Sequence, residues 1–273
     1  AHNRGVYWDN MFFRGSYNTG CTQAYKRPDG TVRASTGVWG LRELVKRTFQ
    51  LMCERGIDPL TMPHITSTNI LPVYSFATIT YDLEWKYGRG KFQDKFSQDY
   101  TLMVTNGELA GAWPLVLGDR GYDEPYFIPR TYTGCLLVHD TYKGQDRAGK
   151  AFLRPVKMML KREACQVHRY WDESPPPVEI EDREVPFIVH WVPGERALIS
   201  VVNYHRGGCR RRIRLWPDRL GFAGEVKIRD YETFRGLFRS LKPKEGADPA
   251  CLEGCLRLGS HAVRMYEVLP VEE

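Results

Sequence analysis

The stretch Gly5-Val6-Tyr7-Trp8-Asp9 decides the fold, because it is a short apolar run that stops at a carboxylate. An apolar run without polar alternation is typical of a parallel strand that is buried on both faces. Comparable runs recur along the first part of the chain, with helical patterns between them. The predicted strands cover residues 5–8, 60–65, 73–80, 112–117 and 135–138. This alternation predicts a parallel sheet built from β/α units.

The best-marked helix follows the first strand. Its apolar residues recur at helical spacing, and they are Leu41, Leu44, Val45, Thr48 and Met52. Ser35 or Thr36 can cap its start, and Gly56 ends it. Further helices are predicted over residues 93–105 and, with a kink at Pro155, up to about Cys165.

Four or five β/α units in about 165 residues fit the latter part of a (β/α)8 TIM barrel, whose full length is about 250 residues. The count falls short by three or four strands, and Ala1 lies next to a strand. The sequence therefore predicts a partial barrel, as the C-terminal piece of a longer protein or as an incomplete gene product. A doubly wound open sheet is the structural alternative, although no GxGxxG turn follows the first strand.

The remainder of the chain has a different pattern, in which short strand-like runs follow one another with turn residues between them. The expected strands are 185–192, 197–204, 211–215, 226–231, 251–258 and 262–269. They predict a small antiparallel β-sandwich. We expect a barrel domain over 1–170, a Pro-rich linker over 171–184 and the sandwich over 185–273.

Composition excludes several classes of protein. The 273 residues carry 39 Lys plus Arg against 33 Asp plus Glu, and this net charge of +6 is too small to indicate a nucleic-acid partner. The basic run from Arg206 to Arg214 alternates with apolar residues, which favours an exposed strand face over a binding site for an acidic polymer. The uncharged stretch 59–81 contains three prolines, so it predicts no membrane helix. Compartment and oligomeric state stay open.

Cysteine usage points to no cofactor or metal. The seven cysteines are scattered and contain no CxxC pair, so neither a disulfide framework nor a zinc site is expected.

In a barrel, working residues lie at the C-terminal ends of the strands. Asp9 directly follows Tyr7 and Trp8 at the end of the first strand, so aromatic rings are expected beside it, and Trp8 is taken as a stacking surface for a sugar. His64 ends the next strand and could orient a hydroxyl or act as general acid or base. Asn69 belongs to the polar loop that follows and is a candidate sugar ligand. For Asp9 and His64 the alternative is a purely structural cap or loop contact.

The third strand leads to Tyr81-Asp82-Leu83-Glu84-Trp85. Strand alternation would place Asp82 and Glu84 on one side and Trp85 on the other, unless the chain turns there. We take Glu84 as the second carboxylate, because two carboxyl groups are the minimum set for glycoside cleavage. Tyr81, Asp82 and Trp85 are expected to bind the sugar.

Two further groups of candidates follow the later strands. His139 and Asp140 come after the possible fifth strand and are assigned to substrate binding, with a helix cap as the alternative for Asp140. Asp123 and Glu124 could supply an acid and a positioning carboxylate, but paired charges in loops are usually solvated.

With these residues identified, the chain resembles glycoside hydrolases in which a TIM barrel precedes a β-sandwich, most nearly the family 123-like group and its uncharacterised relatives. The motifs that carry the resemblance are residues 5–9, Met62-Pro63-His64-Ile65-Thr66, Ser75-Phe76-Ala77 leading to Asp82-Leu83-Glu84, and residues 259–264. Family 123 enzymes use an adjacent Asp and Glu to drive attack by the substrate's own acetamido group. Here Asp9 is followed by Asn10.

The leading prediction is a hydrolase that cleaves a carbohydrate substrate with Asp9 and Glu84 as catalytic carboxylates. Two hypotheses from other classes stay open. A non-catalytic sugar-binding or scaffold protein would bind glycans without releasing reducing ends. A metal-dependent hydrolase would hold a metal on His64, His139 and Asp140.

Overall fold

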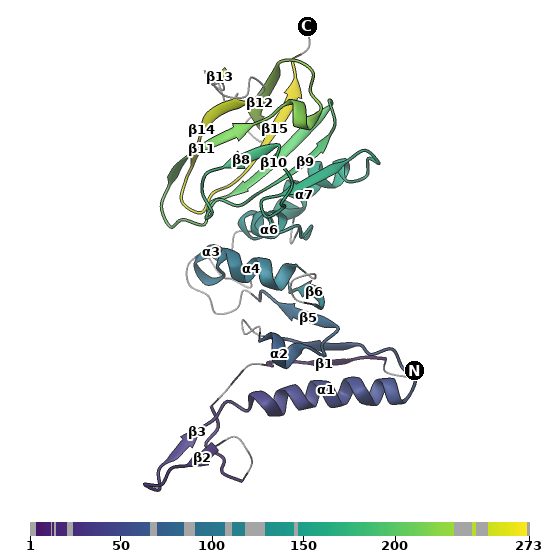
Figure 1. The fold of residues 1–273 in the computed structure, drawn as a ribbon, viewed down its shortest axis with the longest axis vertical. Helices are drawn as coiled ribbons and strands as arrows, with labels where there is room; N and C mark the ends of the chain where they lie inside the picture. Colours follow the sequence, from purple (N-terminus) through teal and green to yellow (C-terminus); the bar gives the residue numbers. More distant parts are fainter. Residues whose placement is uncertain are drawn as a thin grey trace. The chain divides into compact units, whose positions relative to one another are not determined.

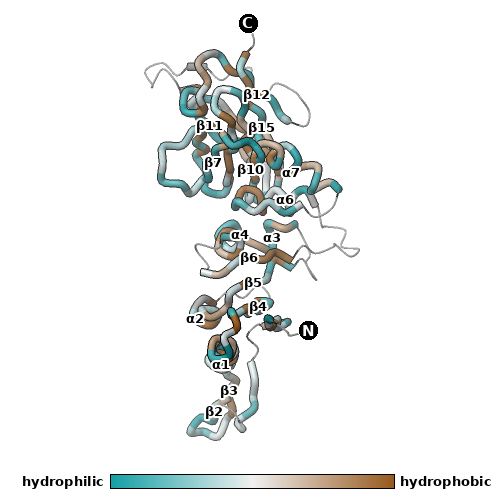
Figure 2. Tube along the Cα trace, turned by 90° about the vertical axis from the view of Figure 1, so that its right-hand side faces the viewer, coloured by the Kyte–Doolittle hydropathy of each residue, from teal (hydrophilic) through white to brown (hydrophobic). Residues whose placement is uncertain are grey.

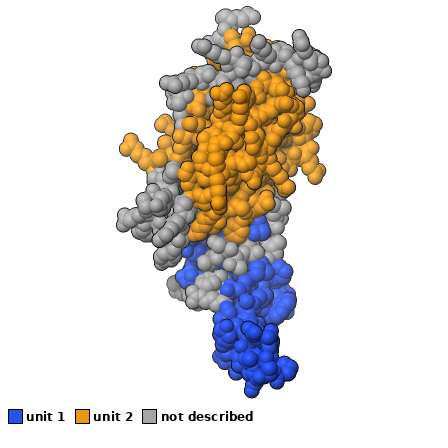
Figure 3. All heavy atoms as spheres, turned by 90° about the vertical axis from the view of Figure 1, so that its left-hand side faces the viewer, with its two compact units in different colours: residues 1–84, 103–119 blue, residues 85–102, 120–273 orange. Residues whose placement is uncertain are grey.

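The computed structural model describes residues 4–11, 13, 15–20, 24–65, 70–84, 91–106, 111–117, 129–144, 147–231, 242–243 and 251–271. The chain divides into two compact units, which Figure 3 shows in different colours. Unit 1 comprises residues 1–84 and 103–119, and unit 2 comprises residues 85–102 and 120–273. The segment 1–170, expected as one barrel domain, is therefore divided between the two units.

The described residues of unit 1 include four parallel strands that neighbour one another in chain order (Figure 1). They are β1 (Val6–Trp8), β4 (Thr61–Pro63), β5 (Ile79–Asp82) and β6 (Trp113–Val116). The pairs β1–β4 and β5–β6 are parallel, and a parallel bridge from His64 to Tyr81 joins them. Sequential parallel strands are the arrangement of a barrel wall. In the described residues the wall stays open, which is consistent with the predicted partial barrel.

Helical segments separate these strands. The helix α1 (Val38–Glu54) lies between β1 and β4, and the short α2 (Leu71–Tyr74) lies between β4 and β5. The end of α1 is as predicted, because Gly56 adopts the left-handed conformation and donates to the carbonyl of Cys53. Its start is not, since Gly37 is the N-cap and no side chain caps the helix.

Three smaller elements complete this part of the chain. A hairpin of β2 (Ala24–Lys26) and β3 (Val32–Ala34) is inserted between β1 and α1. The predicted helix over 93–105 is two helices, α3 (Phe92–Lys95) and α4 (Gln98–Thr105). Both precede β6 in the chain, so the β/α alternation continues to the last described strand of unit 1.

The two faces of the unit 1 sheet differ in burial. One face carries Tyr7 and Leu115, which are 46% and 44% exposed. On the other face Thr61, Asp82 and Val116 are buried. The prediction that these strands are buried on both faces is therefore wrong for one face. The inner wall of a closed barrel packs against strands across the barrel, whereas four strands leave that face open.

Two predicted strands are helical in part or in full. The segment predicted as a strand over 73–80 begins in α2, and only its end enters β5. Pro72 lies in the first turn of α2, where its fixed φ favours a helix start. The possible fifth strand at 135–138 is the end of the helix α6 (Pro129–Leu137). A short apolar run cannot be distinguished from a buried helical turn by its periodicity alone.

Unit 2 is a β-sandwich with helices packed on it. The first sheet has the order β12 (Val226–Asp230), β15 (Val263–Pro270), β10 (Arg196–Val202), β9 (Phe187–Val192) and β7 (Gln166–Arg169). The second has the order β13 (Lys242–Pro243), β14 (Leu252–Leu258), β11 (Cys209–Leu215) and β8 (Val178–Ile180). All their described pairings are antiparallel, as predicted.

The sandwich core lies between its two sheets. Ile199 and Val268 from the first sheet belong to the same buried cluster as Ile213 and Leu256 from the second. The long hydrophobic run of β10 is visible in Figure 2. The sandwich also begins earlier than expected, because the predicted linker 171–184 contains β8 and is preceded by β7.

The basic run contributes to an exposed ion-pair ladder on the second sheet. Arg214 of β11 contacts Glu179 at 3.0 Å, Glu181 at 2.9 Å and Glu253 at 3.2 Å. Arg212 also contacts Glu181 and Glu253. Carboxylates therefore already balance much of the positive charge that could have attracted an acidic polymer.

The helix α6 approaches the sandwich through a glycine. A Cβ atom added at Gly134 would lie 2.3 Å from Val263 Cγ1. We expect Gly134→Ala to lower the free energy of unfolding by about 1–3 kcal/mol, because overpacking outweighs the gain in helix propensity. Urea unfolding measures the change. Gly40→Ala in α1 is the matched control: a Cβ there meets nothing within 4 Å, so it should stabilise slightly. A neutral Gly134→Ala would contradict the close approach.

Candidate active site

Three functional side chains come together at the C-terminal ends of neighbouring strands in unit 1. Asp9 directly follows β1, His64 directly follows β4, and Glu84 lies two residues beyond β5. The backbone N–H of His64 donates to the carbonyl of Trp8, and that of Ile65 donates to the carbonyl of Tyr81. These ladder bonds align the strand ends, so residues 55 positions apart in the sequence become neighbours.

His64 lies between the two carboxylates. Its Nδ1 is 2.9 Å from Asp9 Oδ1, and its Nε2 is 3.6 Å from Glu84 Oε2. The imidazole is almost fully buried, whereas the Asp9 side chain is 60% exposed and that of Glu84 is 18% exposed. An ionised carboxylate only accepts hydrogen bonds, so Nδ1 carries the proton in the bond to Asp9. The ring thus holds the accessible carboxylate of Asp9 by a hydrogen bond, and the more sheltered carboxyl group of Glu84 lies on its other side.

Two tyrosines flank this cluster. The Tyr7 hydroxyl donates to Asp9 Oδ1 at 3.0 Å and lies 3.3 Å from His64 Nδ1. The ring of Tyr81 lies 5.2 Å from the His64 ring and 6.1 Å from the Tyr7 ring, measured between centroids. Both tyrosines share the exposed face of the sheet with His64, because parallel pairing aligns Tyr7 with Met62 and Tyr81 with His64.

The hydrogen bonds of the cluster keep Asp9 ionised. The bonds from His64 and then from Tyr7 lower the pKa of the Asp9 carboxyl. Burial, followed by the bond to Asp9, raises the pKa of Tyr7, so its hydroxyl keeps its proton. Burial and the nearby Glu84 also raise the pKa of Tyr81. The site therefore presents a charged, solvent-accessible carboxylate beside two neutral phenols.

The expected positions of Trp8 and Asp82 are wrong. Trp8 pairs with Pro63 on the sheet face opposite to Tyr7, so it is not the ring beside Asp9. Asp82 is buried, and its charge helps to raise the pKa of Tyr74 to about 12, after burial. The predicted shared side for Asp82 and Glu84 fails because Leu83 has φ 62°, which reverses the alternation.

Tyr7 was missing from the predicted site. The signal was present in the sequence, since Tyr7 stands two residues before Asp9 on a strand. Strand alternation alone would have selected Tyr7 and rejected Trp8.

The remaining candidate residues lie away from the cluster around His64 or outside the described residues. His139 and Asp140 belong to unit 2 and follow the helix α6, not a barrel strand. His139 is buried, with its Nδ1 2.6 Å from the carbonyl of Cys135, and Asp140 is paired with Arg169 at 2.6 Å. These contacts are structural. Asn69, Trp85, Asp123 and Glu124 lie outside the described residues.

In the part of the chain that the structure describes, no group of three or more His, Cys, Asp or Glu side chains is placed to hold a metal ion. No described helix has both the length and the hydropathy required to cross a bilayer.

Removing the Tyr7 hydroxyl tests the electrostatics of the site. We expect Tyr7→Phe to raise the pKa of Asp9, because the ionised carboxylate loses the hydrogen bond that the Tyr7 hydroxyl donates to it. Carboxyl ¹³C NMR titration of Asp9 measures the shift. Tyr25→Phe, in the hairpin, is the matched control and should leave the Asp9 titration unchanged. An unaltered Asp9 pKa in Tyr7→Phe would exclude the bond as its cause.

No protein-family model matches the sequence, and no curated protein matches it. Solved structures of several glycosidases are similar to the chain. A glycoside hydrolase family 27 β-L-arabinopyranosidase from Geobacillus stearothermophilus, in complex with arabinose, is 12% identical with a TM-score of 0.44; the match covers 85% of this chain and 55% of that one. For α-galactosidase I from Mortierella vinacea the identity is 6%, the TM-score 0.40 and the coverage 90% and 64%.

An α-galactosidase from Saccharomyces cerevisiae is 10% identical, with a TM-score of 0.39 and coverage of 97% and 72%. The chain spans about half the length of the arabinopyranosidase that it resembles, 55%. Likeness to glycoside hydrolases is thus found at the level of these structures, and the narrower likeness to the family 123-like group stays a prediction.

Proposed function

We propose that this protein hydrolyses glycosidic bonds with Asp9 and Glu84 as its two working carboxyl groups. One observation carries the proposal: both groups lie beside the same imidazole, His64, at the C-terminal ends of three neighbouring parallel strands, β1, β4 and β5. Strand ends of this kind carry the active sites of barrel enzymes. A pair of carboxyl groups flanking a bond is the set that glycoside cleavage requires.

The roles divide according to the environment of each group. Asp9 is exposed and kept ionised by His64 and Tyr7, so it cannot donate a proton and serves as base or nucleophile. Proton donation to the leaving oxygen then falls to Glu84, which is more sheltered from water. His64 is a positioning residue: it hydrogen-bonds to Asp9 and lies 3.6 Å from Glu84. Tyr7 and Tyr81 supply ring faces for a sugar and hydroxyls for its oxygens.

The chemistry need not be substrate-assisted. The resemblance to the family 123-like group implies an adjacent Asp and Glu, but Asn10 occupies the second position here. Both the backbone N–H and the side-chain amide of Asn10 donate to Asp9, at 2.9 and 3.0 Å. Asn10 therefore orients Asp9, and we propose that the second carboxyl group comes from the next strand but one.

Leaving-group dependence tests the proposal. We expect Glu84→Gln to lose turnover of alkyl glycosides by about 10²–10⁴-fold while it largely keeps turnover of dinitrophenyl glycosides, because a good leaving group needs no proton. Glu43→Gln, on the exposed surface of α1, is the matched control. Equal losses on both substrates would remove Glu84 as the acid. The anomer first released, observed by NMR, shows whether the reaction retains or inverts configuration.

The non-catalytic alternative predicts a different outcome. A sugar-binding or scaffold protein would show saturable glycan binding at this cluster, without release of reducing ends by the wild-type chain.

A further inference from the structure

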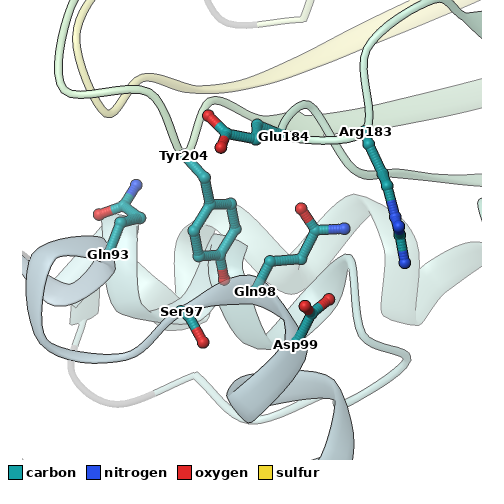
Figure 4. A pocket seen from close by; sticks show the side chains of 7 residues that line it. All are labelled: Gln93, Ser97, Gln98, Asp99, Arg183, Glu184 and Tyr204. Atoms are coloured by element: carbon teal, nitrogen blue, oxygen red, sulfur yellow. The ribbon is translucent and has the colours of Figure 1, made fainter.

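Unit 2 contains a polar cavity of about 290 Å³ that the cluster around Asp9 does not involve. It is formed by the segment from α3 to the start of α4, by the loop after β8 and by Tyr204 in the loop after β10. Figure 4 shows Tyr204 and Gln98 between Arg183 and Glu184 above and Ser97 and Asp99 below. Gln93 completes the lining.

Gln93 is a buried side chain in the lining of this cavity, and hydrogen bonds fix its orientation. Its side chain belongs to a residue that is only 7% exposed. The amide Nε2 donates to the backbone carbonyls of His261 at 3.2 Å and Asn203 at 3.5 Å, which fixes the orientation of the amide. Among the described residues the buried Oε1 accepts no hydrogen bond. A buried acceptor without a donor costs about 1–3 kcal/mol, so this amide is held at an energetic cost beside the cavity.

The remaining lining matches a neutral ligand with many hydroxyl groups. Asp99 and Glu184 only accept hydrogen bonds when ionised, Arg183 only donates, and the Gln98 amide and Ser97 hydroxyl do both. Two carboxylates against one guanidinium leave a net charge of −1 when all three are ionised, which disfavours an anionic ligand. The Tyr204 ring adds an apolar surface. A pyranose has this combination of alternating hydroxyls and apolar C–H faces.

We propose that this cavity is a second carbohydrate site, which binds one neutral sugar residue and takes no part in bond cleavage. It shares with the proposed function only the class of ligand. The two sites belong to different units, so each can fail without the other.

The test is an NMR titration of the ¹⁵N-labelled chain with neutral monosaccharides: glucose, galactose, mannose and N-acetylglucosamine. We expect the side-chain amide signals of Gln93 and Gln98 to shift saturably with at least one of them. Asp99→Ala should raise the dissociation constant at least tenfold. Asp58→Ala, which removes an exposed carboxylate in unit 1, should leave it unchanged, and so should Asp9→Asn.

The outcomes separate the two proposals. Saturation without any shift at Gln93 and Gln98, or an affinity that Asp99→Ala leaves intact, overturns the second site. Neither result bears on turnover at Asp9. Conversely, if the protein has no glycosidase activity but its Gln93 and Gln98 amide signals still shift with sugar, the second site is supported and the proposed hydrolase function is contradicted. Galacturonate is the charged probe, and binding at least as tight as that of the neutral sugars would contradict the predicted neutral ligand.

Discussion

Asp9→Asn is expected to reduce turnover of both aryl and alkyl glycosides by about 10³-fold while the protein stays folded. The substitution removes the charge that His64 and Tyr7 keep on this carboxyl group. It changes neither the shape of the side chain nor the strand that positions it. Because Asp9 is largely exposed, little stability depends on it. Steady-state rates and thermal unfolding, measured on the same preparation, separate lost chemistry from lost folding.

A comparison with two other variants makes this result specific. Asp58→Asn carries the same change of charge on an exposed loop and should behave as wild type. Glu84→Gln should spare substrates with good leaving groups, whereas Asp9→Asn should not, since a base or nucleophile is needed whatever group departs. Wild-type rates in Asp9→Asn would remove Asp9 from the mechanism. Retained glycan binding would then favour the non-catalytic alternative.

The meeting of Asp9, His64 and Glu84 illustrates what sequence reasoning can reach. Each residue was selected because it ends an apolar run, and parallel strands in chain order bring their C-terminal ends to one edge. No pattern in the sequence states that Asp9 contacts His64 across 55 residues. The contact follows from the register of β1 on β4, which places Asp9 one residue beyond the pair Trp8 and Pro63.

The errors have local causes. The left-handed φ of Leu83 turns Glu84 toward His64 and leaves Asp82 on the buried face, and a non-glycine residue gives no advance sign of such a turn. The run Cys135-Leu136-Leu137 is apolar enough for a strand, but it ends a helix whose residues are almost all buried. Where both faces of an element are buried, periodicity carries no information about its type.

The strand β12 of the sandwich was easier to predict for the opposite reason. In β12 the residues Ile228 and Asp230 are buried, whereas Lys227 is exposed, so the strand alternates between core and solvent. Such alternation is readable in the sequence. The early strands β7 and β8 were missed because they are short and because the prolines between them suggested a linker.

Acid is expected to destabilise unit 2 well above the pH at which carboxylates titrate, because two of its histidines are buried and neutral. His139 donates from Nδ1 to the carbonyl of Cys135, and its buried Nε2 accepts nothing from the described residues. His190 Nε2 lies 2.9 Å from the hydroxyl of Tyr142. That hydroxyl has one proton and donates it to Asp140, so His190 must donate from Nε2. Burial lowers the pKa of each histidine to about 4.

The sign of the pH dependence follows from these values. The unfolded chain binds a proton on each histidine near pH 6.5, whereas the folded chain does so only near pH 4. The free energy of unfolding is therefore at its full value above about pH 6.5. It falls as the pH is lowered towards 4, by roughly 3 kcal/mol for each histidine. Near pH 5 the free energy of unfolding should fall by about 2.7 kcal/mol per pH unit, if both groups act.

Urea unfolding followed by tryptophan fluorescence, repeated from pH 8 to pH 4, measures this slope. His190→Gln keeps a donor near Tyr142 and cannot titrate, so it should remove about half of the slope, and His139→Asn should remove the other half by the same reasoning. Above pH 7 each variant should show a flat dependence like that of the wild type, because these histidines are then neutral in both states. A wild-type slope near zero between pH 6.5 and 4 would mean that water reaches these rings. It would contradict the burial of His139 and His190 as neutral side chains.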